Sequence, residues 1–496
     1  MVKKLLFCVL FLIGSSVVAV QEKKLVIVVT SFNNAEWCVK NLETIFFQMN
    51  PENSGLYQNY RVIVIDDNSY DGNAEYIEKY IDDCNQRHRV ILIKNKVRKR
   101  KMANLYYALQ LCEPDEIVFD FDGDDFLADN QVFSLINSIY QNEKVWITYG
   151  SFINWPTNQM GYCKELDPDL VEKRLLRKKW WMPGQLRTFY AWLFHQILLQ
   201  DLLFSGPYYR GQFFPANADL AIYYPMMEMA GLHYEFISKV IYIRNVATPL
   251  NDFKVNKEIQ ILGSKLIRDK ELYPRLKNPL PDYFKQFSHQ KLDIIFFSNN
   301  QSDAQKFVTS CNRLTRNGNA IYIMTNENIT IDQSNNSCKV SVITTTPSSF
   351  KTELNSLLNK CAPYLIFAHD TIIFTEYIDF SESILALEKS FAYASFYALG
   401  CNKTISRTGM GEPVPALNQI NETLFAWGFG YAEAHDWKKY NNRECTLYRT
   451  QTVKEQTKKL EFNNEKDFFE QWSKVPINLE NIGLCYNNAK VGYSLY

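Results

Sequence analysis

The stretch EIVFDFDGDDFL, residues 116–127, places a run of apolar residues directly in front of an acidic cluster. Residues 116–121 have the length and the continuous apolar character of a strand that is buried on both faces. Four aspartates follow within six residues, at positions 120, 122, 124 and 125. Carboxylates held this close repel one another and are costly to remove from water. The stretch therefore predicts a site at the edge of a sheet that holds a positive partner.

The chain before this stretch alternates strand and helix patterns. Strands are expected at 24–30, 61–65 and 90–93, and helices at 35–48, 72–85 and 102–112. Continuous apolar strands separated by helices are typical of a parallel sheet that is covered on both faces. Ligands bind such sheets beyond the carboxyl ends of the strands. The polar residues that end three of the strands, Thr30-Ser31, Asp66-Asp67 and Asp122–Asp125, should therefore meet on one rim.

Two simpler explanations of the acidic cluster are a structural role at a helix start, which stays open as an alternative, and a calcium loop. Asp129 or Asn130 could cap the following helix, but a cap does not need four aspartates. Alternate aspartates also fall at positions 1, 3 and 5 of an EF-hand calcium loop. That loop requires Gly at position 6 and Glu at position 12, where this chain has Asp125 and Gln131. A calcium loop of this type is excluded.

A divalent metal that holds a phosphorylated ligand explains the cluster best. Mg²⁺ and Mn²⁺ prefer carboxylate oxygens and are commonly shared with substrate phosphates. Asp122 and Asp124 lie two residues apart at a strand end, which places both carboxylates on one side of the pleat. The sequence therefore predicts Mn²⁺ or Mg²⁺ as the cofactor.

Three segments together resemble the family 2 glycosyltransferases of GT-A fold: VIVVTSFNN (26–34), RVIVIDDNSYDG (61–72) and VFDFDGDDFL (118–127). The resemblance extends from about residue 24 to residue 256 and implies a nucleotide-sugar donor. It implies that the donor is bound by Thr30, Ser31, Asn33, Asp66, Asp67, Asn104 and Asp122. The metal ligands would be Asp122 and Asp124, with Asp124 the more direct, and Asp125 would lie behind them.

The segment PANADLAIYYPMMEMAG, residues 215–231, resembles the helix that carries the catalytic base in this family. Inverting transfer needs one carboxylate to take the proton of the acceptor hydroxyl. Asp219 stands at that position, although Ala218 replaces an acid that the family often has. A helix cap is the alternative role for Asp219. Glu228 lies nine residues further along the helix, too far away to replace it.

Other segments near these motifs leave their roles open. Residues 97–104, VRKRKMAN, contain four consecutive basic residues, which could form a solvated loop or attract the donor phosphates. Trp181 and Arg187 are candidates for shaping the pockets, with core packing the alternative for the tryptophan. The segment TPLND, residues 248–252, resembles the end of the core domain in part of the family.

The second half of the chain repeats the layout of the first. Residues 277–290 contain two prolines and lose periodicity, which indicates a linker. Strands are then expected at 292–297, 320–324 and 364–368, with a helix at 303–316, so a diverged duplication is plausible. The segments YLIFAHDTIIF, LFAWGFGYAEAHDW and NIGLCYNNAKV (starting at 364, 424 and 481) resemble glycosyltransferase-like domains fused to such enzymes. His369-Asp370-Thr371 stands where metal-binding aspartates would be expected, so we expect a degenerate domain for acceptor binding or packing, with a second active transferase as the alternative.

The ends and the composition of the chain limit its class. Residues 1–20 have the layout of a secretory signal with a cut after Ala19, although a short membrane anchor is the alternative. The protein is therefore expected to be secretory or periplasmic, or held at a membrane through its N-terminus. Lys plus Arg equals Asp plus Glu at 54 each, which argues against a nucleic-acid partner. Ten cysteines follow the leader without a CxxC pair, so disulfides and buried free thiols stay open and structural zinc is disfavoured.

These observations predict an α/β protein with two GT-A (Rossmann-like, nucleotide-diphospho-sugar transferase) domains in tandem, at residues 21–276 and 291–496. The expected function is a metal-dependent, inverting transfer of a sugar from a nucleotide-sugar to a hydroxyl of a glycan or glycolipid. The alternative is a non-catalytic carbohydrate-binding protein built on glycosyltransferase-like domains. A dehydrogenase is disfavoured because no GxGxxG follows the first strand.

Overall fold

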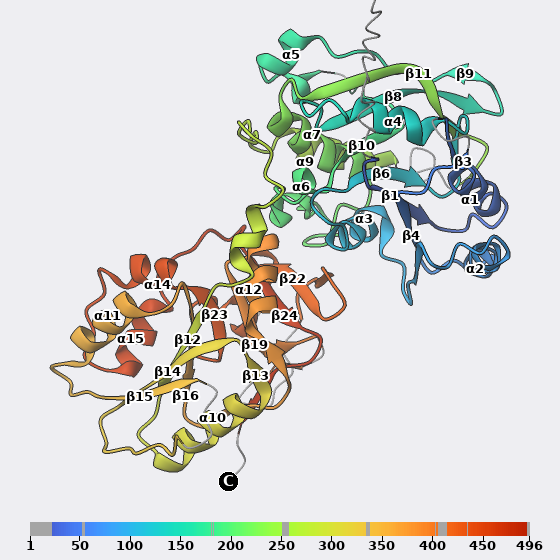
Figure 1. The fold of residues 1–496 in the computed structure, drawn as a ribbon. Helices are drawn as coiled ribbons and strands as arrows, with labels where there is room; N and C mark the ends of the chain where they lie inside the picture. Colours follow the sequence, from blue (N-terminus) through green and yellow to red (C-terminus); the bar gives the residue numbers. More distant parts are fainter. Residues whose placement is uncertain are drawn as a thin grey trace, which may run out of the picture.

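The computed structural model describes residues 22–51, 55–179, 181, 183–249, 257–333, 338–401, 403–404, 414–433 and 435–493. The expected leader and the last three residues of the TPLND segment lie outside this part of the chain. The described residues fold into two α/β halves, each built around one large sheet (Figure 1). This architecture confirms the prediction of two tandem Rossmann-like domains.

The first sheet has the strand order β5-β4-β1-β6-β10-β8-β11-β7, with β9 paired to β8. Its strands are β1 (Leu25–Ser31), β4 (Tyr60–Asp66), β5 (Val90–Lys94), β6 (Ile117–Asp122), β7 (Phe126–Leu127), β8 (Ile147–Trp155), β9 (Gln159–Met160), β10 (Arg187–Tyr190) and β11 (Tyr234–Asn245). Strands β5, β4, β1 and β6 are parallel, whereas β10 runs antiparallel between β6 and β8. The carboxyl ends of β1, β4 and β6 therefore meet on one rim, as the sequence predicts.

Helices cover both faces of this sheet. They are α1 (Cys38–Phe46), α2 (Asn73–Asp83), α3 (Arg100–Gln110), α4 (Val132–Ile139), α5 (Pro168–Glu172), α6 (Ala191–Phe194), α7 (Ala218–Ala230) and α9 (Lys257–Arg268). Alternate residues of β1 enter different cores: Val26 and Val28 pack with α3 and α7, whereas Ile27 and Val29 pack with α1 and α4. Each element predicted between residues 24 and 122 is present, with its ends shifted by at most three residues.

The second sheet has the order β15-β14-β12-β16-β23-β19-β24-β22-β21, with β20 paired to β19. Its strands are β12 (Leu292–Phe297), β14 (Gly318–Thr325), β15 (Lys339–Thr344), β16 (Tyr364–His369), β19 (Ala394–Gly400), β20 (Lys403–Thr404), β21 (Asn418–Gln419), β22 (Leu424–Gly428), β23 (Thr446–Arg449) and β24 (Ile482–Tyr486). The first seven positions repeat the first sheet strand by strand. Within these seven positions, β23 runs antiparallel to both of its neighbours and stands where β10 stands in the first sheet.

The helices of the second half are α10 (Gln301–Leu314), α11 (Phe350–Lys360), α12 (Phe380–Lys389), α13 (His435–Lys438), α14 (Thr450–Thr457) and α15 (Glu465–Trp472). The order of the elements also repeats. In the first half, α7 precedes the last parallel strand, β11. In the second half, α15 precedes the corresponding strand, β24. The repeated strand order and the repeated helix order support the predicted duplication.

The segment between the two sheets is packed against both halves. It contains the 3-10 helix η3 (Tyr283–Phe287), and the buried Phe284 contacts the rings of His195 in the first half and Phe391 in the second. One hydrophobic cluster extends from Val26 and Val28 of β1 to residues of β12. The two halves therefore share a continuous core.

Within the described residues, no helix has the length and apolar character that a membrane span requires. The ten cysteines at positions 38 to 485 are all free thiols in this structure. Five of them are buried, at positions 38, 112, 311, 445 and 485. Of the two alternatives that the sequence leaves open, the structure has free thiols.

Candidate active site

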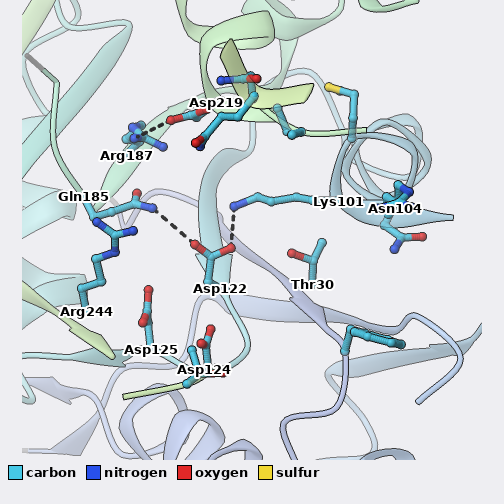
Figure 2. Close-up of a pocket in the computed structure, with 18 of the residues that line it drawn as sticks. Thr30, Lys101, Asn104, Asp122, Asp124, Asp125, Gln185, Arg187, Asp219 and Arg244 are labelled. Carbon is cyan, nitrogen blue, oxygen red and sulfur yellow. Dashed lines mark hydrogen bonds and ion pairs between the residues drawn. The ribbon is translucent and has the colours of Figure 1, made fainter. Parts of the chain in front are cut away.

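A cavity of about 520 Å³ opens at the carboxyl ends of the strands of the first sheet. Its lining comes from the ends of β1 and β6, the start of α3, strands β8 and β10, and the segment that leads into α7. The polar lining residues include Thr30, Ser31, Asp67, Arg98, Arg100, Lys101, Asn104, Asp122, Asp124, Asp125, Gln185, Arg187, Asp219 and Arg244. Figure 2 shows Asp122 between Gln185 and Lys101, with Asp219 and Arg187 across from Asp124 and Asp125.

The acidic loop packs tightly against the end of β1. A Cβ atom at Gly123 would lie 2.7 Å from Cβ of Ser31, so only glycine fits between Asp122 and Asp124. The side-chain amide of Asn41 donates to the carbonyls of Asp122 (2.9 Å) and Asp125 (2.7 Å). These contacts fix the main chain that carries the carboxylates.

Asp125 faces the protein rather than the cavity centre. Its Oδ2 accepts from the hydroxyl of Tyr242 at 2.6 Å and its Oδ1 accepts from N–H of Asn245 at 2.6 Å. Both partners belong to β11. Burial, followed by the neighbouring carboxylates of Asp124 and Asp122, raises the pKa of Asp125 well above its ordinary value. Asp125 thus links the acidic loop to strand β11.

Lys101 extends from α3 into the acidic cluster. Its Nζ lies 2.5 Å from Oδ1 of Asp122 and 3.1 Å from Oδ1 of Asp120. Burial would raise the pKa of Asp122, but the ammonium outweighs this effect and the pKa falls below its ordinary value. At Asp124 the balance is reversed: burial and then the charge of Asp122 outweigh the charges of Lys101 and Arg244 and raise its pKa to about 7.

A second cation, Arg187 of β10, links the cluster to the start of α7. Its Nη1 lies 3.8 Å from Oδ2 of Asp120, and its Nη2 lies 3.4 Å from Oδ2 of Asp219. The side chain of Asp120 is 1% exposed, whereas that of Asp219 is 31% exposed and lines the cavity. Opposite charges therefore alternate along an ion-pair chain, which runs Asp122, Lys101, Asp120, Arg187, Asp219.

The donor-side residues predicted from the sequence form a second network. Asp67 accepts hydrogen bonds from N–H of Lys99 (2.8 Å), N–H of Arg100 (2.7 Å) and Nδ2 of Asn95 (2.9 Å). Asn95 also donates to Oδ1 of Asn104 at 2.8 Å. Asp67 and Asn104 line the cavity, and together they fix the loop that enters α3.

Two predicted donor residues do not line the cavity. Oδ1 of Asn33 accepts from N–H of Tyr70 at 3.0 Å. Asp66 accepts from Nδ2 of Asn73 at 2.6 Å and from N–H of Ser69 at 3.1 Å. Both side chains organise the loop that follows β4, whereas Thr30 and Ser31 reach the lining directly.

The four consecutive basic residues point to four different partners. Arg98 lies over the ring of Phe32, 3.7 Å from its centroid, and Arg100 donates to the hydroxyl of Tyr209 at 2.8 Å. Lys99 donates to Gln419 of the second domain at 2.6 Å, and Lys101 joins the acidic cluster. Each of the four side chains therefore has a contact within the protein, although Val97 and Arg98 remain exposed.

The donor set fits a hard cation that is shared with a phosphorylated ligand. The carboxylates of Asp122 and Asp124 both line the cavity, and burial together with the charge of Asp122 raises the pKa of Asp124 to about 7. Among the described residues, no three His, Cys, Asp or Glu side chains are grouped as a metal site. A cation at this rim would thus take part of its oxygen ligands from a diphosphate or from water.

Sequence reasoning missed several residues of this site. Asp120 lies two residues before Asp122 on the same face of β6, so the period of the strand could have identified it. The partners of Lys101 could not be predicted, because a run of basic residues does not show where each side chain points. Gln185, whose Nε2 lies 3.5 Å from Oδ2 of Asp122, and Arg244 come from distant segments and carry no motif.

Comparisons with known proteins give a family for part of the chain. Residues 26–203 match the profile of the family described as glycosyl transferase family 2. A search of curated proteins gave no match. Among solved structures, TarS residues 1–349 from S. aureus in complex with UDP is 16% identical, with 50% of this chain and 67% of that chain covered and a TM-score of 0.36.

Two further solved structures are similar at the same level. The mannosyltransferase PcManGT from Pyrobaculum calidifontis, in complex with GDP-Man and Mn²⁺, is 19% identical over 53% of this chain and 67% of that chain, with a TM-score of 0.33. GalNAc-T7 with UDP, GalNAc and Mn²⁺ is 14% identical over 45% and 44% of the two chains, with a TM-score of 0.32. At these values the family assignment rests on the sequence profile. Residues 26–203 therefore form a glycosyl transferase family 2 domain, which makes this part of the chain a glycosyltransferase domain.

Proposed function

We propose that the first domain moves a sugar, with inversion, from a nucleotide-sugar to a hydroxyl of a glycan or glycolipid, in the presence of Mn²⁺ or Mg²⁺. One observation carries the proposal: Asp122 and Asp124 line the same cavity as Asp219, from different elements of the fold. Transfer needs a charged leaving-group site and a base across from it, and the cavity offers both. Its volume of about 520 Å³ also falls in the range of small-molecule sites.

The donor side of the cavity supports binding of a nucleoside diphosphate. Phe32 offers an aromatic face whose other side is covered by Arg98. Asp67 holds the adjoining loop through two main-chain N–H groups, so the wall is formed before a ligand arrives. A wall that is already ordered lowers the entropy lost on binding.

The diphosphate would lie beside Asp122, Asp124 and Lys101. Asp124 and Asp122 would hold the cation, which when bound neutralises charge that develops on the departing nucleoside diphosphate. Lys101 adds a positive charge fixed by Asp120 and Asp122 at the same rim. With a bound cation, these groups would supply the positive charge that the leaving group needs on one side of the cavity.

Asp219 is the proposed base. Arg187 holds one of its oxygens at 3.4 Å, and 31% of the side chain stays exposed to the cavity. An acceptor hydroxyl placed against that oxygen would give its proton to Asp219 as it attacks the sugar. The guanidinium would hold the carboxylate in the orientation in which it faces the acceptor.

The test is donor hydrolysis by the purified chain with Mn²⁺ and a panel of nucleotide-sugars. We expect hydrolysis of one donor class, lost in Asp124→Ala and retained in the matched second-domain variant Asp370→Ala. Glycan binding without hydrolysis of any donor, unchanged in Asp122→Ala, Asp124→Ala and Asp219→Ala, would instead support the non-catalytic carbohydrate-binding alternative.

The cell compartment is part of the proposal as well. Residues 1–20 would direct export to a secretory or periplasmic compartment, or hold the protein at a membrane. Mass spectrometry of the mature N-terminus decides between these outcomes. A chain that begins after Ala19 indicates export, and a chain that keeps Leu5–Val20 indicates an anchor.

A further inference from the structure

A hairpin of the second domain reaches onto the first domain next to its cavity. The hairpin consists of β21 and β22, paired antiparallel with Asn418 opposite Ala426, and lies beside α3 of the first domain (Figure 1). Asn418 and Gln419 stand at the contact. They hydrogen-bond to two separate loops of the first domain, and each of these loops continues into the cavity lining.

The first loop is the one that Asp67 orders. Oε1 of Gln419 accepts from Nζ of Lys99 at 2.6 Å. The main-chain N–H groups of Lys99 and Arg100 donate to the two oxygens of Asp67. Lys99 is therefore held twice: its main-chain N–H binds Asp67 and its side chain binds Gln419. The loop that forms the donor side of the cavity is thus fixed by residues of both domains.

The second loop leads to the proposed base. Asn418, which is 6% exposed, accepts from N–H of Phe213 at 3.0 Å and donates to the carbonyl of Gly211 at 2.8 Å. Gly211 has φ +79°, and a Cβ atom there would lie 2.9 Å from the side chain of Tyr431 in the second domain. Residues 214–219, which follow directly, line the cavity and end at Asp219.

The two loops also contact each other. Nη2 of Arg100 donates to the hydroxyl of Tyr209 at 2.8 Å, and the guanidinium lies 4.9 Å from the centroid of that ring. The hairpin, the donor loop and the base loop therefore form one connected unit. A shift of the hairpin would change the distance between the donor wall and the wall that carries Asp219.

We propose that Asn418 and Gln419 are positioning residues, through which the second domain sets the spacing of the donor loop and the base loop in the first domain. The chemical part of this inference rests on the proposed function, whereas the structural part rests on the contacts alone. The role assigned to the second domain is support of the neighbouring site. It needs neither a metal nor a substrate of its own.

The first test measures binding of UDP and GDP to the full-length chain with Mn²⁺ by isothermal titration calorimetry. Gln419→Ala removes one hydrogen bond to a charged group, so we expect Kd for the nucleoside diphosphate to rise about 3- to 10-fold. Gln419→Glu keeps an acceptor for Lys99 and should bind like the wild type. Gln419→Lys places two ammonium groups together and should bind more weakly than Gln419→Ala. Asn359→Ala, on the exposed side of α11, is the matched control.

A double-mutant cycle separates positioning from general packing. If Gln419 acts through Lys99, Gln419→Ala should have no further effect on Kd in a Lys99→Ala background. Additive effects of the two changes would contradict the proposal. Asn418→Ala acts on the other loop, so we expect it to lower kcat for donor hydrolysis while Kd for the nucleoside diphosphate stays near the wild-type value.

Hydrogen exchange gives a readout that needs no ligand. In Gln419→Ala, amides of residues 96–101 should exchange faster, and in Asn418→Ala those of residues 209–214 should do so, with Asn359→Ala unchanged. Unchanged exchange in both segments overturns the inference whatever the enzyme does. Failure of the wild type to bind any nucleoside diphosphate would contradict the proposed function while leaving the exchange result to decide this inference.

Discussion

The two domains share a strand order but differ at the carboxyl ends of their central strands. Leu25 pairs with Ile117 in the first sheet, and Leu292 pairs with Tyr364 in the second. Counting along both strands from these pairs makes His369 the counterpart of Asp122. The same rim therefore carries a carboxylate in one domain and an imidazole in the other.

Among the described residues, the central ion pair of the first domain, Asp120 and Arg187, has an uncharged counterpart in the second domain. Asp120 lies opposite Arg187 in the first sheet, and the corresponding pair in the second sheet is Phe367 and Thr446. Phe367 is fully buried and contacts the ring of Trp472 at a centroid distance of 5.3 Å. Because a buried ion pair can be replaced by apolar packing with little loss of stability, the fold survives without its charges. The comparison indicates that this fold does not require the charges of the first domain, which agrees with the role in chemistry that we propose for them.

The largest difference between the two domains is expected when the proposed base, Asp219, is replaced. Asp219→Asn removes the proton acceptor and should lower the rate of transfer by about 10²- to 10⁴-fold. The matched change Glu465→Gln, in the first turn of α15 in the second domain, should leave the rate unchanged. The measurement is the initial rate with a saturating donor. Equal losses in both variants would show that the second domain also takes part in the chemistry.

The next effect concerns the buried carboxylate Asp120. Asp120→Leu leaves the ammonium of Lys101 and the guanidinium of Arg187 without their shared partner, so we expect a loss of about 3–5 kcal/mol in the free energy of unfolding. Phe367→Leu, at the counterpart position, removes only packing and should cost about 1 kcal/mol. Urea unfolding of both variants measures the difference. Similar losses would mean that the chain of charges does not behave as a buried network.

A pH effect of similar size is expected at the boundary of the two domains. Burial, and then Lys389 of the second domain, lowers the pKa of His195 to about 4, and Nε2–H donates to the carbonyl of Leu109 at 2.8 Å. The unfolded chain binds a proton here below about pH 6.5 and the folded chain only below about pH 4. The contribution of His195 to the free energy of unfolding is therefore fully present above about pH 6.5. It falls by about 3 kcal/mol as the pH drops to about 4.

His195→Gln tests this pH effect. The amide can still donate to Leu109, but it does not titrate, so this part of the pH dependence between 6.5 and 4 should disappear. Denaturant unfolding at several pH values gives the measurement. A variant with the same slope as the wild type would assign the pH dependence to other groups.

The smallest expected effect concerns Phe32, at the donor side of the cavity, and its counterpart in the second domain. The counterpart of Phe32 in the second domain is Asn299, so the aromatic face belongs to the first domain only. Arg98→Ala removes the guanidinium from that ring and should raise Kd for a nucleoside diphosphate by less than about tenfold. Lys96→Ala in the same loop is the control. Equal effects of both changes would point to overall charge rather than to the ring.

The sequence predicted what is periodic and local. Strand β12 has the predicted bounds, Leu292–Phe297, because its residues form an apolar run between polar ends. The partners of Lys101 and Lys99 were not predicted, because long side chains in a basic run can point anywhere. The contact of Gln419 with Lys99 joins positions 320 residues apart, and no local pattern encodes such a contact.

The most direct test of the central claim is a crystal structure of the chain with Mn²⁺ and a nucleoside diphosphate, with anomalous data collected for manganese. We expect one anomalous peak against Asp122 and Asp124, in contact with the diphosphate, and none beside His369. A nucleoside diphosphate bound without a peak at these two aspartates, or a peak and ligand at the rim of the second domain, would contradict a metal-dependent transferase site in the first domain.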